Sequence, residues 1–303
     1  MMPKYQTHFK ALGTKITLTV FSSFDQQVFA PSKHLIDYYE KLFSIYLSDS
    51  EISRINRAAG QKMIKVSTPT FDLVTLAKKI SLKSWGFNAA IGPLVKEWNV
   101  GFEDAHRPDK NQVRQLLHQI DPQKIATQAP NLIGLQQTGM QLDLGGIAKG
   151  YIADRLKDLW AAFGVRTGII DLGGNLLTIG NSPLHADQKW RIGIQDPWNP
   201  RGKALRVVRM PACSAVTSGI YERNFTENHH FYHHILDPRT GYPLKTQLMG
   251  VTVFTDQSVW GEIESTRLFF NPETAVDELK KDRHFMAAVF VYQIGRASCR
   301  ERV

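Results

Sequence analysis

Residues 142–154 read Leu-Asp-Leu-Gly-Gly-Ile-Ala-Lys-Gly-Tyr-Ile-Ala-Asp, which predicts a short apolar strand, a Gly-Gly turn and the start of a helix. Apolar side chains then recur at the spacing of one helix face, and Gly164 is expected to end the helix. This face consists of Ala148, Ile152, Leu156, Leu159 and Phe163.

The Gly-Gly turn is a candidate anion site. Gly145 and Gly146 are expected to leave backbone N–H groups free at the positive end of the helix dipole, where Lys149 adds a full charge. A phosphate suits these groups, but a tight turn before a core helix explains the glycines equally well. Neither standard nucleotide fingerprint matches: Gly150 is followed by Tyr151 where a P-loop has lysine, and the spacing also fails G-x-G-x-x-G.

Composition limits the class of protein. The chain has 303 residues, of which 43% are hydrophobic and 21% charged, which is typical of a globular protein with a substantial core. The net charge of +9 comes from scattered Lys and Arg, so it favours anionic ligands generally and does not single out nucleic acid. Two cysteines form no disulfide framework, and no apolar run approaches the roughly 20 residues of a spanning helix.

The two ends of the chain carry separate expectations. Residues 1–10 are polar and show no signal peptide, so the chain as written is expected to be cytoplasmic. Residues 293–303 resemble the in-frame translation of a sequencing-library adapter. We therefore predict a single domain over residues 1–292, truncated at its C-terminus, followed by a non-native tail.

Other segments show clear periodicity or turn chemistry. A strand is expected over residues 9–21, and the second Asp-Leu-Gly-Gly sequence, at residues 171–174, predicts a hairpin turn. Amphipathic helices are expected over residues 33–43, 71–85 and 109–119.

Two clusters of polar residues point to chemistry. His234 lies at a strand edge just before a Pro-Arg-Thr-Gly turn, although a single histidine is most often structural. Glu262 and Thr266 are four residues apart and share one face if their segment is helical. A carboxylate with a hydroxyl suits a hard cation such as Mg²⁺, but such a pair is more often a surface hydrogen bond.

With these motifs, the chain resembles the FAD:protein FMN transferase family, the ApbE proteins. The matching segments follow the family order over nearly all of residues 9–292, and they are 12–14, 50–56, 88–98, 143–154, 171–175, 190–197, 217–225 and 234–243. The resemblance implies an α+β fold of antiparallel sheets with flanking helices and a flavin site between its two halves. It also implies Mg²⁺-dependent transfer of FMN from FAD to a threonine or serine hydroxyl of an acceptor protein, with release of AMP.

The resemblance also assigns roles to residues. His234 corresponds to the general base, a role that suits an imidazole. The metal ligands would be the carbonyl of Gly146 and the side chains of Glu262 and Thr266. The FAD-binding positions would be Leu12, Tyr46, Gly86, Phe87, Asn88, Asp143, Lys149 and Ile235.

Three positions depart from the family pattern, and they keep alternatives open. Glu262 stands where aspartate is usual, Leu12 where methionine is usual, and Asn88 where aspartate is frequent. Most relatives are exported and lipid-anchored, whereas no lipobox cysteine occurs here. The alternatives are an enzyme that hydrolyses FAD to FMN and AMP, and a non-catalytic FAD-binding protein. The acceptor protein and the oligomeric state are not encoded in any motif.

Overall fold

The computed structural model describes residues 3–22, 25–293 and 297–301, and the chain divides into two compact units. The first unit consists of Met1–Glu40, Ile147–Ser218 and Leu248–Val303, and the second of Lys41–Gly146 and Gly219–Gln247. This division concerns compactness alone, so the single domain over residues 1–292 stays a prediction. Among the described residues, no helix combines the length and apolar character needed to cross a membrane.

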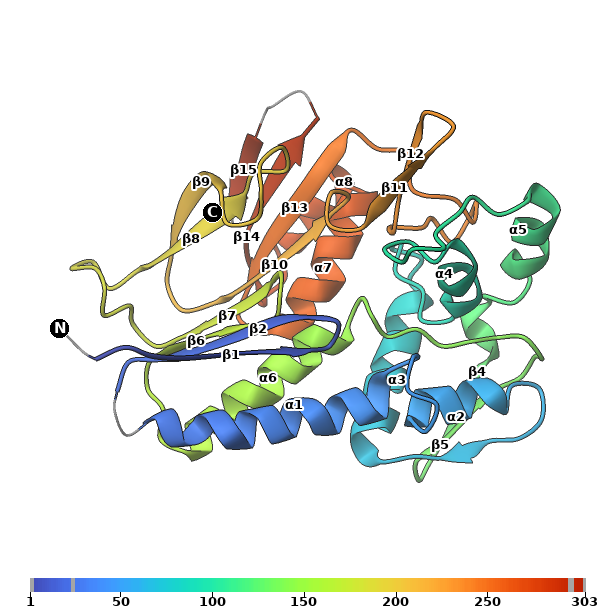
Figure 1. The fold of residues 1–303 in the computed structure, drawn as a ribbon, viewed down its shortest axis with the longest axis horizontal. Helices are drawn as coiled ribbons and strands as arrows, with labels where there is room; N and C mark the ends of the chain where they lie inside the picture. Colours follow the sequence, from blue (N-terminus) through green and yellow to red (C-terminus); the bar gives the residue numbers. More distant parts are fainter. Residues whose placement is uncertain (1–2, 23–24, 294–296, 302–303) are drawn as a thin grey trace. The chain divides into compact units, whose positions relative to one another are not determined.

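An eight-stranded sheet forms the centre of the first unit, in the order β1-β2-β6-β7-β10-β13-β14-β15 (Figure 1). Its neighbouring pairs β1–β2, β2–β6, β6–β7, β7–β10, β13–β14 and β14–β15 are antiparallel. This confirms the predicted α+β class with antiparallel sheets. The strands are β1 (Tyr5–Ala11), β2 (Thr14–Val20), β6 (Gly168–Asp171), β7 (Asn175–Ile179), β10 (Ser214–Gly219), β13 (Leu248–Thr255), β14 (Phe285–Tyr292) and β15 (Ala297–Glu301).

The prediction of one strand over residues 9–21 is wrong, because the chain reverses in the middle of it. Leu12 and Gly13 have φ angles of 53° and 68°, so they form the two-residue turn of the β1–β2 hairpin. Leucine disfavours this left-handed conformation. The Leu12 N–H donates to Oε1 of Glu40 at 2.9 Å, a contact from a residue 28 positions away that helps to hold the turn.

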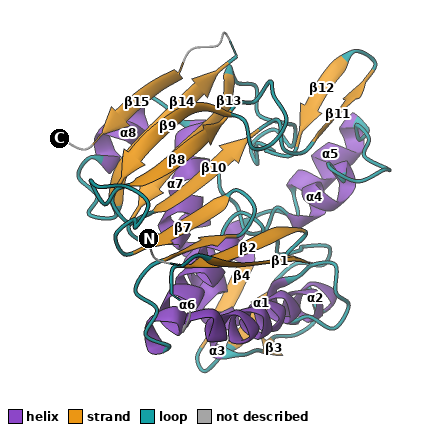
Figure 2. Cartoon of the chain, turned by 60° about the vertical axis from the view of Figure 1, so that its left-hand side comes forward, coloured by secondary structure: helices purple, strands orange, loops and turns teal. Residues whose placement is uncertain are grey.

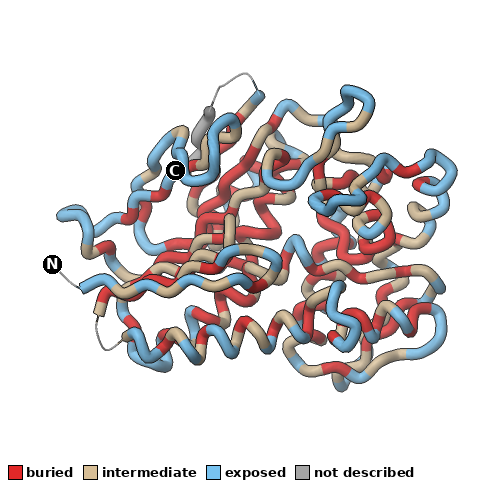
Figure 3. The backbone as a smooth tube through the Cα atoms, in the orientation of Figure 1, coloured by how far each residue is buried: buried red, intermediate tan, exposed pale blue. Residues whose placement is uncertain are grey.

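Both faces of the large sheet are covered at β13 and β14, where nearly all consecutive residues are buried, whereas alternate residues of the edge strand β1 are exposed (Figure 3). Strands β8 (Trp190–Gln195) and β9 (Ala204–Met210) pair with each other, and their apolar side chains pack against β14 at Ala287, Val289 and Val291. Helices α6 (Ala148–Ala162) and α7 (Ser258–Phe270) pack on each other, and both contact β7 (Figure 2). The unit also contains η1 (Asp25–Val28), α8 (Thr274–Leu279) and most of α1 (Phe29–Phe43), whose last three residues belong to the second unit.

The second unit combines short helices with two small sheets (Figure 2). Trp98 is fully buried at the centre of a cluster, and its indole N–H donates to the Gly241 carbonyl at 2.8 Å. The helices are α2 (Glu51–Arg57), α3 (Thr68–Ser81), α4 (Gly92–Trp98), α5 (Lys110–Leu117) and η2 (Pro122–Lys124). The strands are β3 (Ile64–Lys65), β4 (Ile125–Gln128), β5 (Leu132–Leu135), β11 (Asn224–Glu227) and β12 (His230–His233).

The helices predicted over residues 33–43, 71–85 and 109–119 correspond to α1, α3 and α5. At the other end, the predicted foreign tail over residues 293–303 includes β15, which pairs with β14. Residues 294–296 and 302–303 of this tail lie outside the described residues. The pairing does not bear on the origin of the tail, which stays a prediction.

Candidate active site

The strand predicted over residues 142–144 is absent from the structure, and the backbone of Leu142 and Asp143 is bonded to other parts of the chain instead. Leu142 donates its N–H to Oδ1 of Asn56 at 2.7 Å, and its carbonyl accepts from Nδ2 of the same side chain at 3.0 Å. The N–H of Asp143 donates to the Ala89 carbonyl at 2.9 Å. Because a side chain and a loop satisfy these backbone groups, a strand ladder has no role here.

The Gly-Gly turn is less open to an anion than its sequence predicts. The N–H of Gly145 donates to Oδ1 of Asp143 at 2.6 Å, so a carboxylate of the chain already takes one of the two groups that were expected to be free. Burial raises the pKa of Asp143, while the Gly145 N–H and the charge of Arg223 oppose this rise. Neither Gly145 nor Gly146 has a left-handed φ. The two glycines are therefore not required by a left-handed backbone, although a Cβ at Gly145 would lie only 3.0 Å from Oδ1 of Asp143.

Helix α6 follows the predicted apolar periodicity over most of its length. Ile152 and Leu156 are fully buried, and Gly164 ends the helix with a φ of 78°. Phe163 lies one residue beyond the helix and is 48% exposed, so it does not belong to the buried face. Lys149 is half-buried in the first turn, and its role in binding an anion stays a prediction.

The second Asp-Leu-Gly-Gly sequence forms the predicted hairpin turn, between β6 and β7. The N–H of Gly173 donates to Oδ1 of Asp171 at 2.9 Å, the same local bond as in the first copy. Here, however, Gly173 and Gly174 have φ angles of 70° and 93°. A Cβ at Gly173 would lie 2.1 Å from Oγ1 of Thr14, so glycine is required on two grounds.

Glu262 and Thr266 both lie on α7, so their segment is helical, which is the condition under which the two side chains share one face. The Glu262 side chain is only 7% exposed, and its Oε1 accepts from Nδ2 of Asn175 at 2.9 Å. Within the described part of the chain, the other oxygen, Oε2, has no hydrogen-bond partner. Oγ1 of Thr266 donates to the backbone carbonyl of Glu262 at 3.2 Å. The carboxylate is therefore anchored at one oxygen only.

Helices α6 and α7 approach very closely next to this carboxylate. A Cβ at Gly150 would lie 2.5 Å from the Ser258 carbonyl oxygen and 2.8 Å from Cγ of Glu262. At the start of α7, Asp154 accepts the N–H groups of Ser258 and Val259, at 2.7 and 2.9 Å. Glycine on α6 and a carboxylate cap from α6 thus fix the position of Glu262 in the first unit.

In the second unit, Tyr46 and Arg223 lie near enough to Asp143 to interact with its charge. Partial burial and the nearby charge of Asp143 raise the pKa of Tyr46, and Arg223 opposes this effect. The Tyr46 ring lies 5.5 Å from the ring of Phe102, measured between centroids. Arg223 and Phe102 were not predicted, because each is a single residue outside any catalytic spacing. Arg223 does lie within the family segment at residues 217–225, although nothing in that segment distinguishes it.

Two adjacent histidines have opposite environments. His233 is 4% exposed, its Nε2 donates to the Leu244 carbonyl at 3.0 Å, and its Nδ1 accepts the Ile235 N–H at 3.3 Å. His234 is half-buried, and its Nδ1 lies 3.2 Å from the Arg223 carbonyl. A carbonyl only accepts, so Nδ1 of His234 carries the proton in this contact and Nε2 carries the lone pair.

Three other residues predicted to contact the flavin, Gly86, Phe87 and Asn88, have structural roles within the second unit of the chain. Asn88 is 8% exposed, donates from Nδ2 to the Ile120 carbonyl at 2.8 Å and accepts the Ala90 N–H at 2.9 Å. Aspartate could not donate to that carbonyl, which explains an asparagine at this position. Gly86 has a φ of 98°, and a Cβ at Gly146 would lie 3.4 Å from the Phe87 ring.

The predicted site residues are thus distributed over both units. Leu12, Lys149, Glu262 and Thr266 belong to the first unit, and Tyr46, Gly86, Phe87, Asn88, Asp143, Gly146, His234 and Ile235 to the second. Within the second unit, Tyr46 and Asp143 come close enough to interact electrostatically. Among the described residues, no group of three or more His, Cys, Asp and Glu side chains is arranged as a metal cluster.

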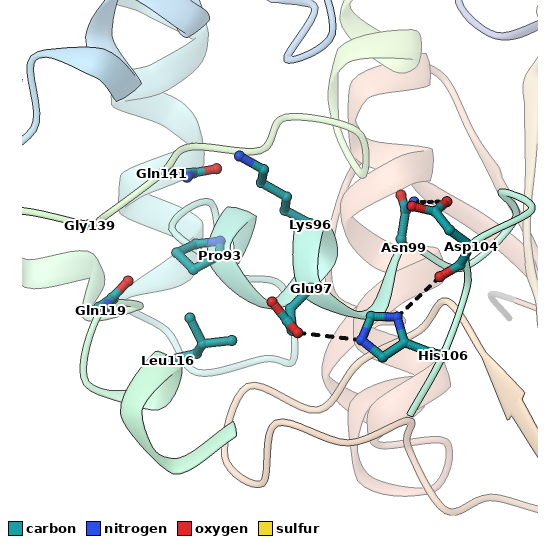
Figure 4. Close-up of a pocket in the computed structure, with 10 residues that line it drawn as sticks. All are labelled: Pro93, Lys96, Glu97, Asn99, Asp104, His106, Leu116, Gln119, Gly139 and Gln141. Atoms are coloured by element: carbon teal, nitrogen blue, oxygen red, sulfur yellow. Dashed lines mark hydrogen bonds and ion pairs between the residues drawn. The ribbon is translucent and has the colours of Figure 1, made fainter. Parts of the chain in front are cut away.

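A pocket of about 360 Å³ lies elsewhere in the second unit, around α4 (Figure 4). Lys96 and Glu97 line it, and Nε2 of His106 lies 3.4 Å from Oε1 of Glu97. None of the predicted flavin or metal residues is among the described residues that line this pocket. The pocket therefore does not mark the predicted site.

Known proteins share both the sequence and the fold. A FAD:protein FMN transferase of Klebsiella pneumoniae (strain 342) is 40% identical over 260 residues, which cover 85% of this chain and 79% of that protein. Another, of Treponema pallidum (strain Nichols), is 36% identical over 248 residues, covering 78% of this chain and 68% of that protein.

Solved structures agree with the sequence comparison. The crystal structure of the ApbE protein of Thermotoga maritima MSB8 has a TM-score of 0.87 at 25% identity, and the match covers 98% of this chain and 96% of that one. The apo flavinyl transferase ApbE of Pseudomonas stutzeri has a TM-score of 0.82, covering 99% of this chain and 94% of that one; at 24% identity it supports the fold alone. Because the model of the ApbE family matches residues 12–290, nearly the whole described chain, this protein belongs to the ApbE family.

Proposed function

We propose that this protein is an enzyme that transfers FMN from FAD to a threonine or serine hydroxyl of an acceptor protein and releases AMP. The observation that carries the proposal is the 40% identity over 260 residues to a protein named FAD:protein FMN transferase. That name supports flavin transfer to a protein. The leaving group, the acceptor hydroxyl and the need for Mg²⁺ are our additions, and they rest on the residues discussed next.

His234 is proposed as the general base. With the proton on Nδ1 held by the Arg223 carbonyl, Nε2 has the lone pair needed to take a proton from the acceptor hydroxyl. The hydroxyl oxygen forms a bond to the phosphorus of the FMN portion, and the pyrophosphate bond to AMP breaks. The proton moves to Nε2 and AMP departs with the bonding electrons, so the step balances without an oxidant or reductant.

Glu262 and Thr266 are proposed to hold Mg²⁺, with the Gly146 carbonyl as the third predicted ligand. The residues fit the ion, because Glu262 is only 7% exposed and one of its carboxylate oxygens has no hydrogen-bond partner among the described residues. Thr266 adds a hydroxyl on the same helix, and Mg²⁺ prefers oxygen ligands. When bound, the ion would neutralise phosphate charge as the pyrophosphate bond breaks. Lys149 is proposed to add a positive charge toward the same pyrophosphate.

Two alternative functions would give different products from FAD. An enzyme that uses water in place of the acceptor hydroxyl would give free FMN and AMP, and a non-catalytic binder would retain intact FAD. The favoured function differs from both because it leaves flavin covalently attached to a second protein.

The test is to incubate the protein with FAD, Mg²⁺ and an acceptor flavoprotein that carries a threonine target, and then to detect flavin fluorescence on the acceptor in a denaturing gel. The matched control is the same acceptor with its threonine changed to alanine. We expect a fluorescent band only with the intact acceptor, together with AMP in equal amount by chromatography. Free FMN without a fluorescent band would show that the protein hydrolyses FAD and does not transfer FMN. Unchanged FAD would show that the protein binds FAD without catalysis.

A further inference from the structure

We propose that Asn175 is a positioning residue, which holds Oε1 of the Glu262 carboxylate and leaves Oε2 as the oxygen that would bind a metal. This inference rests on the proposed function, since it takes Glu262 as a metal ligand. It concerns a residue to which neither the sequence motifs nor the relatives' names assign a role. It also explains how glutamate can serve where the family pattern has aspartate.

The contact between the two side chains is direct and buried. Asn175 is the first residue of β7, immediately after the Gly173-Gly174 turn, and it is completely inaccessible to solvent. Its Nδ2 donates to Oε1 of Glu262 at 2.9 Å. A hydrogen bond to a charged acceptor in a buried setting is among the stronger kinds, so it holds the carboxylate in one rotation.

The orientation of the Asn175 amide is itself determined by its neighbours. The hydroxyl of Ser258 donates to Oδ1 of Asn175 at 2.8 Å, and it accepts from the hydroxyl of Ser214 at 3.0 Å. The donors therefore run in one direction, from Ser214 through Ser258 and Asn175 to Glu262. A reversed amide would place its oxygen against the carboxylate, which is unfavourable. The amide group thus faces Glu262 with its N–H.

The anchor compensates for the length of the glutamate side chain. Glutamate has one more rotatable bond than aspartate, so an unrestrained carboxylate would lose more entropy on binding a metal. Gly150 leaves room for Cγ of Glu262 against the α6 backbone, and Asn175 holds Oε1. Oε2 is left as the oxygen for the ion. Partners that orient a ligand in this way typically change metal affinity by about 10- to 100-fold.

The test measures metal affinity and not activity. Mn²⁺ is titrated into the FAD-loaded full chain without an acceptor, and the free ion is counted by electron paramagnetic resonance. We expect Asn175→Ala to weaken Mn²⁺ binding by about 10-fold or more. The matched control is Thr178→Val on the same strand, where a buried hydroxyl that bonds to the Cys213 backbone is removed. This control should lower the melting temperature without changing Mn²⁺ affinity.

Two further variants distinguish an error in the metal assignment from an error in the role of Asn175. Ser258→Ala removes the donor to Asn175 and should weaken Mn²⁺ binding in the same direction by a smaller factor, which keeps the test available if Asn175→Ala does not fold. Glu262→Gln tests the metal assignment itself. If Glu262→Gln leaves Mn²⁺ binding unchanged, the metal site of the proposed function is wrong. If it abolishes binding while Asn175→Ala or Ser258→Ala matches Thr178→Val, the positioning role of Asn175 alone is refuted.

Discussion

Acid should destabilise the protein through His233, because its imidazole is buried in the neutral form. Burial lowers the pKa of His233 from 6.5 to about 4, and the hydrogen bond to the Leu244 carbonyl opposes this only in part. The neutral ring satisfies both partners, since Nε2 donates to Leu244 and Nδ1 accepts from the Ile235 N–H. Protonation would add a hydrogen at Nδ1, directly opposite that N–H.

The direction and size of the effect follow from proton linkage. Between pH 6.5 and about 4 the unfolded chain binds a proton at this histidine and the folded chain does not, so stability falls as the pH falls through this interval. At 1.36 kcal/mol for each pH unit, the interval corresponds to about 3 kcal/mol. Below about pH 4 both states are protonated, and the contribution of His233 no longer changes.

The assay is urea unfolding at a series of pH values, with His233→Gln as the comparison. Glutamine supplies a donor and an acceptor but does not titrate, so the wild type should lose about 3 kcal/mol more than the variant between pH 7 and pH 4. His8→Gln, at an exposed position on β1, controls for the general loss of a histidine. Parallel stability curves for the wild type and His233→Gln would refute the neutral, buried assignment.

Three other outcomes are expected. Lys149→Met should weaken FAD binding by roughly 1–3 kcal/mol in fluorescence titration and leave riboflavin binding unchanged, because riboflavin has no phosphate; equal losses would contradict a contact with the anion. His234→Ala should lower flavin transfer on the order of 10²-fold or more with little change in FAD affinity, and a parallel fall in both would exclude it as the base. Gly150→Ala should lower the free energy of unfolding, measured in urea, by about 1–3 kcal/mol, because its Cβ would lie 2.5 Å from the Ser258 carbonyl oxygen. Alanine is a better helix former than glycine, so a stabilised variant would contradict the close packing of α6 and α7.

Periodicity and turn chemistry predicted the elements that local sequence controls. The helix after the Gly-Gly turn and the β6–β7 hairpin occur as predicted, and the segment that carries Glu262 and Thr266 is helical, as their shared face required. In each case the deciding information lies within a few residues: an apolar stripe, a spacing of four residues, or a pair of glycines. Such signals survive folding because tertiary contacts reinforce them.

Long-range contacts decided the elements that could not be predicted. The turn at Leu12 places a leucine in a left-handed conformation, and its N–H is held by Glu40, which no local pattern indicates. Leu142 forms no strand because Asn56, 86 residues away, takes both of its backbone groups. The anchor between Asn175 and Glu262 spans 87 residues and likewise depends on the packing of α7 against β7.

The two adjacent histidines show how one short segment can separate stability from chemistry. His233 ends β12 and is buried, with the proton on Nε2, whereas the contact of His234 with the Arg223 carbonyl requires its proton on Nδ1. Neighbouring residues of an extended segment point to opposite sides, so the same backbone can hold the two rings in opposite tautomers. Because Ile235 donates its N–H to the His233 ring, the residue that follows the proposed base is tied to the histidine that must stay neutral. Acid strong enough to protonate the His233 ring would break this bond and thereby also disturb the backbone next to His234.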